Sequence, residues 1–105
     1  MNIRFCYLYR DSANYKQFNE VVFSNRDLIP LREINNRITN SLIDSTWFNA
    51  DDWGLPNQFF DEYIWNNEID HTWHEFEFVK ESNLEPTQTI SILDFLLKIE
   101  TLKKS

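Results

Sequence analysis

The segment IRFCYLY, residues 3–9, decides the fold that the sequence predicts. Its bulky side chains occupy every second position: Ile3, Phe5, Tyr7 and Tyr9. An alternation with a period of two is typical of a β-strand, and aromatic and branched residues favour strands. We therefore predict a strand near the centre of a small sheet, with its bulky face against helices.

The segments that follow complete the N-terminal half of the domain. Polar residues over 10–19 predict a loop, and the run at 20–24 predicts a second strand, antiparallel to the first. Apolar side chains then recur at spacings of three and four, which predicts a helix over about 30–43 with Pro30 in its first turn. This helix is expected to pack on the sheet.

The C-terminal half begins with a stretch that has no clear period. Residues 44–67 are therefore expected to be irregular, and Trp53-Gly54-Leu55-Pro56 within them is typical of a turn. Alternation over 72–79 predicts a third strand, with Phe76 and Phe78 facing inward.

A broad apolar face predicts a terminal helix over about 90–103, which Ser91 would cap together with Asp94. The order is β-β-α-irregular-β-α over one domain, residues 1–105. The predicted class is α+β, a small antiparallel sheet with two helices on one face.

Composition excludes several classes of protein. The 105 residues are 42% hydrophobic and 16% aromatic, which predicts a folded chain rather than a disordered one. One Cys excludes an intrachain disulfide, and one Gly excludes a glycine-rich phosphate loop. Arg4 and Arg10 interrupt the apolar N-terminus, so we expect no signal peptide, no membrane span and a cytoplasmic location, where Cys6 is a small buried hydrophobe.

Negative charge is concentrated in the middle of the chain. The chain carries a net charge of -7, and residues 44–85 hold eleven acidic residues against Lys80 alone. All four Trp lie in the same block. Direct binding to nucleic acid is disfavoured, because it requires clustered Lys and Arg.

Acidic and aromatic residues interleaved in this way are typical of a recognition surface with aromatic anchors. We therefore predict a non-catalytic protein-binding module or inhibitor that engages a basic surface of a protein partner. Bacterial antitoxins, immunity proteins and anti-defence proteins fit this profile. The residues expected to bind the partner are Asp51, Asp52, Trp53, Asp61, Glu62 and Trp65.

A metal-assisted hydrolase or transferase is the alternative from another class. His71, His74 and Glu75 form the densest group of potential metal ligands, but two His three positions apart share a face only on a helix. On the predicted strand they point to opposite faces, unless His71 lies in the preceding turn. The residues thus favour a protein without catalytic activity or a cofactor.

Two further features of the sequence suggest binding. Arg10 and Lys16 follow the first strand and could accept an anion, although a local ion pair between Arg10 and Asp11 would use the same charge. An exposed sheet edge would favour a homo-oligomeric structural subunit.

Three separated stretches carry a resemblance to a known family. They are Tyr7-Leu8-Tyr9-Arg10-Asp11 with Asn14-Tyr15-Lys16, then Trp53-Gly54-Leu55-Pro56, then Asp70-His71-Thr72-Trp73-His74-Glu75-Phe76. In this order they resemble a family of small uncharacterised bacterial proteins. The resemblance implies a bacterial cytoplasmic domain, and because no activity is attached to the family it implies no catalytic residue.

Overall fold

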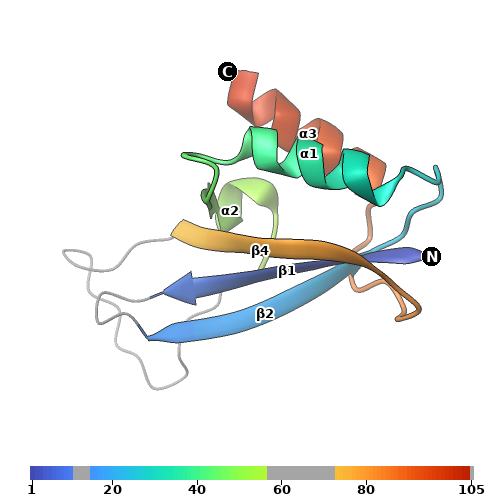
Figure 1. The fold of residues 1–105 in the computed structure, drawn as a ribbon, viewed down its shortest axis with the longest axis horizontal. Coiled ribbons are helices and arrows are strands. Elements are labelled where there is room, and N and C mark those ends of the chain that lie inside the picture. Colours follow the sequence, from blue (N-terminus) through green and yellow to red (C-terminus); the bar gives the residue numbers. More distant parts are fainter. Residues whose placement is uncertain (11–14, 57–72, 105) are drawn as a thin grey trace.

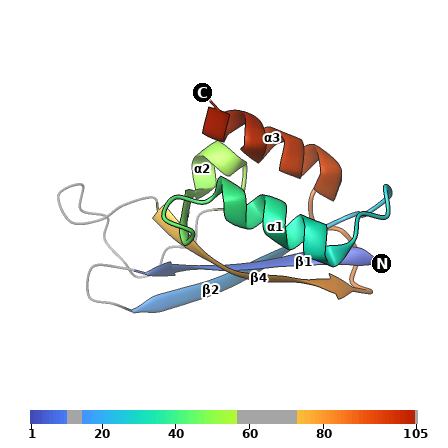
Figure 2. The same ribbon diagram turned by 45° about the horizontal axis from the view of Figure 1, so that its top comes forward.

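A four-stranded antiparallel sheet carries helices on one of its faces (Figures 1 and 2). The computed structural model describes residues 1–10, 15–56 and 73–104. For Lys104 it describes the backbone alone. This arrangement confirms the α+β class, and a short third helix lies in the stretch expected to be irregular. The elements are β1 (Asn2–Arg10), β2 (Lys16–Phe23), α1 (Leu31–Ser41), β3 (Trp47–Asn49), α2 (Ala50–Trp53), β4 (Trp73–Ser82) and α3 (Ile92–Lys104).

Strand β1 lies inside the sheet, whose order is β2-β1-β4-β3. It pairs antiparallel with β2 on one side and with β4 on the other. Ile3, Phe5 and Tyr7 from its bulky face are fully buried in the core beneath the helices. The predictions of a central strand, of an antiparallel second strand and of a bulky inner face are therefore confirmed.

Strand β2 is longer than the sequence suggested, because it begins at Lys16 within the predicted loop. The register pairs Lys16 with Arg10 and Phe18 with Leu8. An edge strand is paired on one side only, so a polar half that faces solvent is stable there without an apolar run. The loop prediction was wrong for this reason.

Strand β4 contains a bulge that changes the face of one predicted core residue. Cys6 pairs with Phe78, but Tyr7 pairs with Phe76, so Glu77 is an extra residue on β4. An extra residue reverses the alternation beyond it. Phe76 packs on the core as predicted, whereas Phe78 is 43% exposed on the opposite face. The prediction that Phe78 faces inward was therefore wrong.

The ring of Phe5 lies at the centre of the aromatic core. Its centroid lies 5.2 Å from that of Phe76 and 5.6 Å from that of Phe95, which belongs to α3. Phe48 from β3 lies 5.8 Å away and Trp53 from α2 lies 6.4 Å away. The sheet, α2 and α3 are therefore joined through one set of rings.

Helices α1 and α3 lie side by side above the sheet (Figure 1). The Arg37 guanidinium on α1 donates to both carboxylate oxygens of Glu100 on α3, at 2.9 and 2.6 Å. Ser91 accepts a hydrogen bond from the Asp94 N–H at the start of α3, as its predicted capping role requires. Among the described residues, no helix is long and apolar enough to cross a membrane.

Helix α2 fills the segment for which the sequence predicted only a turn. The Asn49 side chain accepts hydrogen bonds from the N–H groups of Asp51 and Asp52 and so caps the helix start. Gly54 ends the helix with a φ of 71°, a conformation that glycine adopts without strain. One turn of helix is too short to show a period, so the sequence pattern missed it.

Candidate functional site

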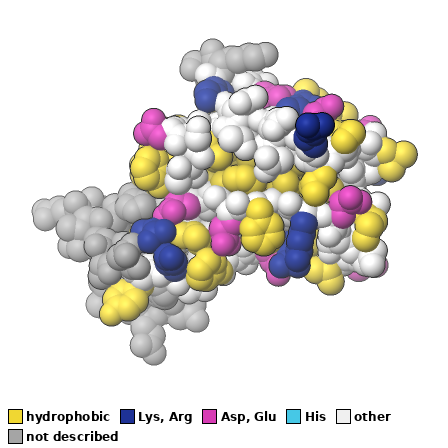
Figure 3. Space-filling model, viewed as in Figure 1, with side chains coloured by type: hydrophobic (Ala, Val, Ile, Leu, Met, Phe, Trp, Pro, Cys, Tyr) yellow, Lys and Arg dark blue, Asp and Glu magenta, His cyan; other side chains and the backbone are white. Residues whose placement is uncertain are grey.

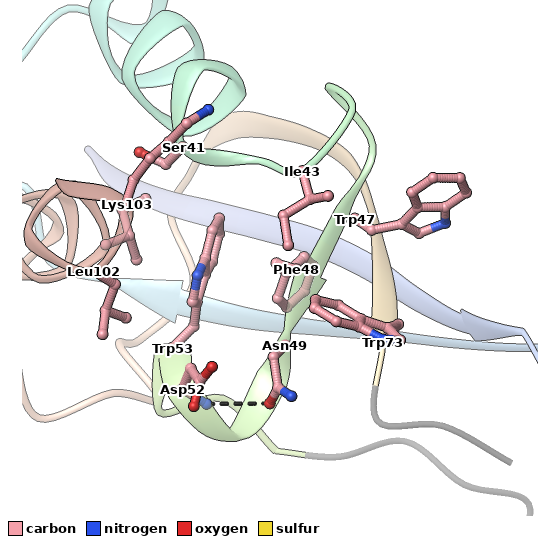
Figure 4. Close-up of a pocket in the computed structure, with 11 residues that line it drawn as sticks. Ser41, Ile43, Trp47, Phe48, Asn49, Asp52, Trp53, Trp73, Leu102 and Lys103 are labelled. Atoms are coloured by element: carbon pink, nitrogen blue, oxygen red, sulfur yellow. Dashed lines mark hydrogen bonds between the residues drawn. The ribbon is translucent and has the colours of Figure 1, made fainter. Parts of the chain in front are cut away.

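An aromatic hollow opens where the edge strand β3 meets α2 and the end of α3 (Figure 4). It has a volume of about 280 Å³, and a second depression of about 260 Å³ shares three of its lining residues. We call the two together the β3 hollow. Its apolar lining consists of Ile43, Trp47, Phe48, Trp53, Trp73, Ile99 and Leu102.

The sheet and the helices contribute different parts of the β3 hollow. Trp53 from α2 stacks on Phe48 from β3, with ring centroids 4.6 Å apart, and the two are almost fully buried. Trp47 and Trp73, by contrast, are 42% and 40% exposed, and Ile43 beside them is 50% exposed. A buried pair of rings and an exposed group of two indoles and one aliphatic side chain therefore line the same hollow.

A tight turn closes the backbone edge of β3 beside the hollow. The Ile43 N–H donates to the Trp47 carbonyl at 2.8 Å, and the Trp47 N–H donates to the Ile43 carbonyl at 2.9 Å. Between them, Asp44 and Ser45 have positive φ angles of 51° and 58°. The outward backbone groups of Trp47 are therefore used within the chain, and this part of the edge presents side chains.

Three exposed carboxylates lie on the segments that form the β3 hollow: Asp44, Asp51 and Asp52. Asp44 lies in the turn between Ile43 and Trp47, and Asp52 contributes to the hollow itself. The ammonium of Lys103, on the same rim, donates to the carbonyls of Asn40 and Leu42 at the end of α1. The positive charge on the rim is thus held by backbone oxygens.

The described acids of the central block do not form one continuous acidic field. Glu75 and Glu81 are six residues apart on β4, which corresponds to about 20 Å along an extended strand. Asp51 and Asp52 lie on α2, whereas Glu75 is opposite Trp47 in the sheet and its charge is matched by Arg10. On the face drawn in Figure 3, apolar, acidic and basic side chains alternate. The expected coherent negative patch is therefore reduced, among the described residues, to the three carboxylates at the β3 hollow.

The residues predicted to bind a partner have different surroundings. Asp51 and Asp52 are exposed, as such a role requires. Trp53 is only 5% exposed, so the expectation of an exposed indole at this position was wrong. It is buried because α2 turns its ring onto Phe48 and Phe95. Asp61, Glu62 and Trp65 lie outside the described residues.

Trp47 and Trp73, rather than Trp53, are the exposed indoles that the structure describes. For Trp73 the sequence pattern indicated this exposure. Trp73 alternates in step with Glu75, which places it on the polar face of its strand. Trp47 precedes a buried Phe48 in a strand of three residues, which is too short for a pattern.

The predicted metal ligands do not converge in the described part of the chain. His74 is fully buried, with its ring 5.2 to 5.9 Å from those of Tyr7, Tyr9 and Phe48. Glu75, the next residue on β4, points to the other face. His71 lies outside the described residues, and within them no group of three or more His, Cys, Asp or Glu side chains could hold a metal.

Two other groups considered as reactive or anion-binding are engaged elsewhere. Arg10 donates to both carboxylate oxygens of Glu75, at 2.6 and 3.2 Å, so its charge is already matched across the sheet. Burial raises the pKa of the Cys6 thiol, although a hydrogen bond from Arg4 opposes this. A raised thiol pKa disfavours the nucleophilic thiolate.

Comparison with models of protein families found no match, and searches of curated proteins and of solved structures found none either.

Proposed function

We propose that this protein is a non-catalytic binding module that holds a basic segment of a protein partner at the β3 hollow. The observation that carries the proposal is the contiguous exposure of Ile43, Trp47 and Trp73 at one sheet edge. Two half-exposed indoles are costly to leave in water, and Trp is enriched among the residues that dominate binding energy. A partner side chain that covers them would release ordered water from both.

The charges around the hollow favour a basic partner. Asp44, Asp51 and Asp52 would attract a positive segment, while the ammonium of Lys103 is occupied by backbone carbonyls. An Arg or Lys side chain can also stack on the face of an indole. The β3 hollow thus combines an aromatic surface, from Trp47 and Trp73, with negative charge from neighbouring residues.

Recognition at this edge is expected to use side chains rather than strand addition. The turn at residues 43–47 already satisfies the outward N–H and carbonyl of Trp47. A partner strand would have to break these hydrogen bonds before it could pair. Where the basic segment is the partner's own working surface, such a module acts as an inhibitor.

The test uses the purified chain to capture partners from an extract of the organism that encodes it, with identification by mass spectrometry. A captured protein is then produced, and its dissociation constant is measured with two variants, Trp47→Ala with Trp73→Ala and Asp51→Lys with Asp52→Lys. We expect each to weaken binding about 10-fold or more, and we expect binding to the native chain to weaken with salt.

Two control variants make changes of the same kind, apolar side chain to Ala and acid to Lys, at exposed sites away from the β3 hollow. Leu84→Ala removes an exposed apolar side chain, and Glu85→Lys reverses an exposed charge. Both are expected to leave the dissociation constant unchanged. Equal affinity of the Trp47→Ala, Trp73→Ala variant and the native chain would refute the proposal.

A further inference from the structure

The opposite edge of the sheet, formed by β2, has backbone groups that are not paired by any residue the structure describes. The Val22 N–H donates to Thr87 Oγ1, and its carbonyl accepts from the Thr87 N–H, both at 2.8 Å. The backbone groups of Val22 thus point away from β1. Because these directions alternate along a strand, those of Lys16, Phe18 and Glu20 point outward as well. No other described residue satisfies them.

We propose that two copies of the chain pair antiparallel through this edge, with the two-fold axis at Phe18. In an antiparallel pair, outward-pointing residues must meet outward-pointing residues, which an axis at any residue from 16 to 20 allows. An axis at Gln17 sets Lys16 opposite Phe18, and one at Asn19 sets Glu20 opposite Phe18, so neither pairs Lys16 with Glu20. An axis at Lys16 or Glu20 would set like charges opposite each other, and an axis at Glu20 would also require Val22, which Thr87 already occupies. Phe18 remains.

The register with its axis at Phe18 is self-complementary in charge. It sets Lys16 of each copy opposite Glu20 of the other, and Phe18 opposite Phe18. Lys16 is exposed and forms no ion pair with the described residues of its own chain, whereas Glu20 pairs with Arg4. The second copy therefore supplies Lys16 with a carboxylate that the described residues of its own chain do not.

The side-chain surroundings support the same register. Phe18 is 56% exposed and lies beside Leu8 in the sheet, so pairing joins two such apolar pairs into one row across the axis. A depression of about 400 Å³ runs from this edge across β1 to β4, and its charged lining residues are Glu20, Glu77 and Arg4, two acids against one base. It would receive the incoming Lys16.

The expected dimer is weak and depends on concentration. Pairing over Lys16–Glu20 covers less surface than the roughly 1,200 Å² of a stable interface, so we expect a dissociation constant of about 10 to 1,000 µM. Lys16 and Phe18 lie at the edge opposite the β3 hollow, so this inference does not rest on the proposed function.

The test measures molecular mass by sedimentation equilibrium over a range of concentrations. Lys16→Glu sets Glu against Glu twice across the axis, and Glu20→Lys sets Lys against Lys, so each is expected to weaken self-association at least 10-fold. Mixed in equal amounts, the two variants regain opposite charges at both contacts and are expected to form a heterodimer. Lys80→Glu, which makes the same charge change on the same face of the sheet, is the control.

A second variant tests the backbone pairing. The Phe18 N–H points away from β1, so Phe18→Pro removes no hydrogen bond within one copy but blocks pairing between copies. We expect this variant to be monomeric with unchanged circular dichroism. A native chain that stays monomeric up to about 1 mM, or a dimer that both Phe18→Pro and Lys16→Glu leave intact, would overturn the proposal.

Discussion

At one edge of the sheet, β3 is three residues long and the turn before it uses the outward backbone groups of Trp47. At the other edge, β2 is eight residues long, and the described part of the chain covers it at its end, where Thr87 binds Val22. Exposed indoles lie beside the closed edge, whereas alternating charges flank Phe18 on the open one. An edge without free backbone groups recognises a partner by its side chains, and an edge with them can add a strand.

The difference follows from what lies next to each strand. Helix α2 follows β3 directly. The turn before β3 brings Ile43 alongside Trp47, where the two form a β-bridge. Strand β2, by contrast, is covered, as far as residues 1–10, 15–56 and 73–104 show, where the segment before α3 crosses it.

The largest expected effect is on the free energy of unfolding, and it distinguishes the buried Trp53 of the β3 hollow from the exposed Trp47. Trp53→Ala should lower the free energy of unfolding by about 3–5 kcal/mol, because it leaves a cavity against Phe48 and Phe95. Trp47→Ala should cost less than about 1 kcal/mol, because its ring is half exposed. Urea unfolding of both variants measures the difference, and equal losses would contradict the division into support and contact surface.

A smaller effect is expected from Tyr7, whose hydroxyl joins the two regions. It donates to the Pro56 carbonyl beyond α2 at 2.7 Å and accepts from the Asn19 side chain of β2 at 3.0 Å. Burial raises the pKa of Tyr7 to about 12, and the hydrogen bond from Asn19 partly opposes this shift.

The raised pKa of Tyr7 predicts a loss of stability in alkali. As the pH rises, the unfolded chain releases the Tyr7 proton near pH 10, before the folded chain does near pH 12. The free energy of unfolding should therefore fall between these values, by up to about 3 kcal/mol. Denaturation of the native chain and of Tyr7→Phe across this range measures it, and parallel curves would show that Tyr7 does not contribute.

The smallest expected effect concerns the covered end of β2. Thr87→Val removes the hydroxyl that accepts from the Val22 N–H and should cost about 1–2 kcal/mol. Thr87→Ser keeps the hydroxyl and is expected to retain most of the stability. Amide hydrogen exchange should report faster exchange at Val22 in the valine variant alone. Unchanged exchange would mean that Thr87 does not protect this edge.

The sequence pattern predicted those parts of the fold where a period repeats several times. The alternation of Ile3, Phe5 and Tyr7 was sufficient to place β1 inside the sheet, since only a buried strand face holds such side chains together. The β4 bulge could not be predicted, because the extra residue at Glu77 is defined by its pairing with β1 and not by its own side chain.

The candidate site was predicted in part. The sequence pointed to Asp51 and Asp52, which are exposed beside the hollow, because charged side chains are rarely buried without a partner. The prediction named Trp53 as an exposed binding residue and left out Trp47 and Trp73. It was wrong because an indole packs equally well inside a core or at its rim.

The sequence by itself determined the class of fold, the inner face of β1 and the two long helices, because these follow from periods that persist over several turns or alternations. Only the tertiary structure decided which indoles are exposed and which sheet edge is open. Those properties depend on which segments lie against β3 and β2, and contacts between segments distant in the chain leave no local pattern.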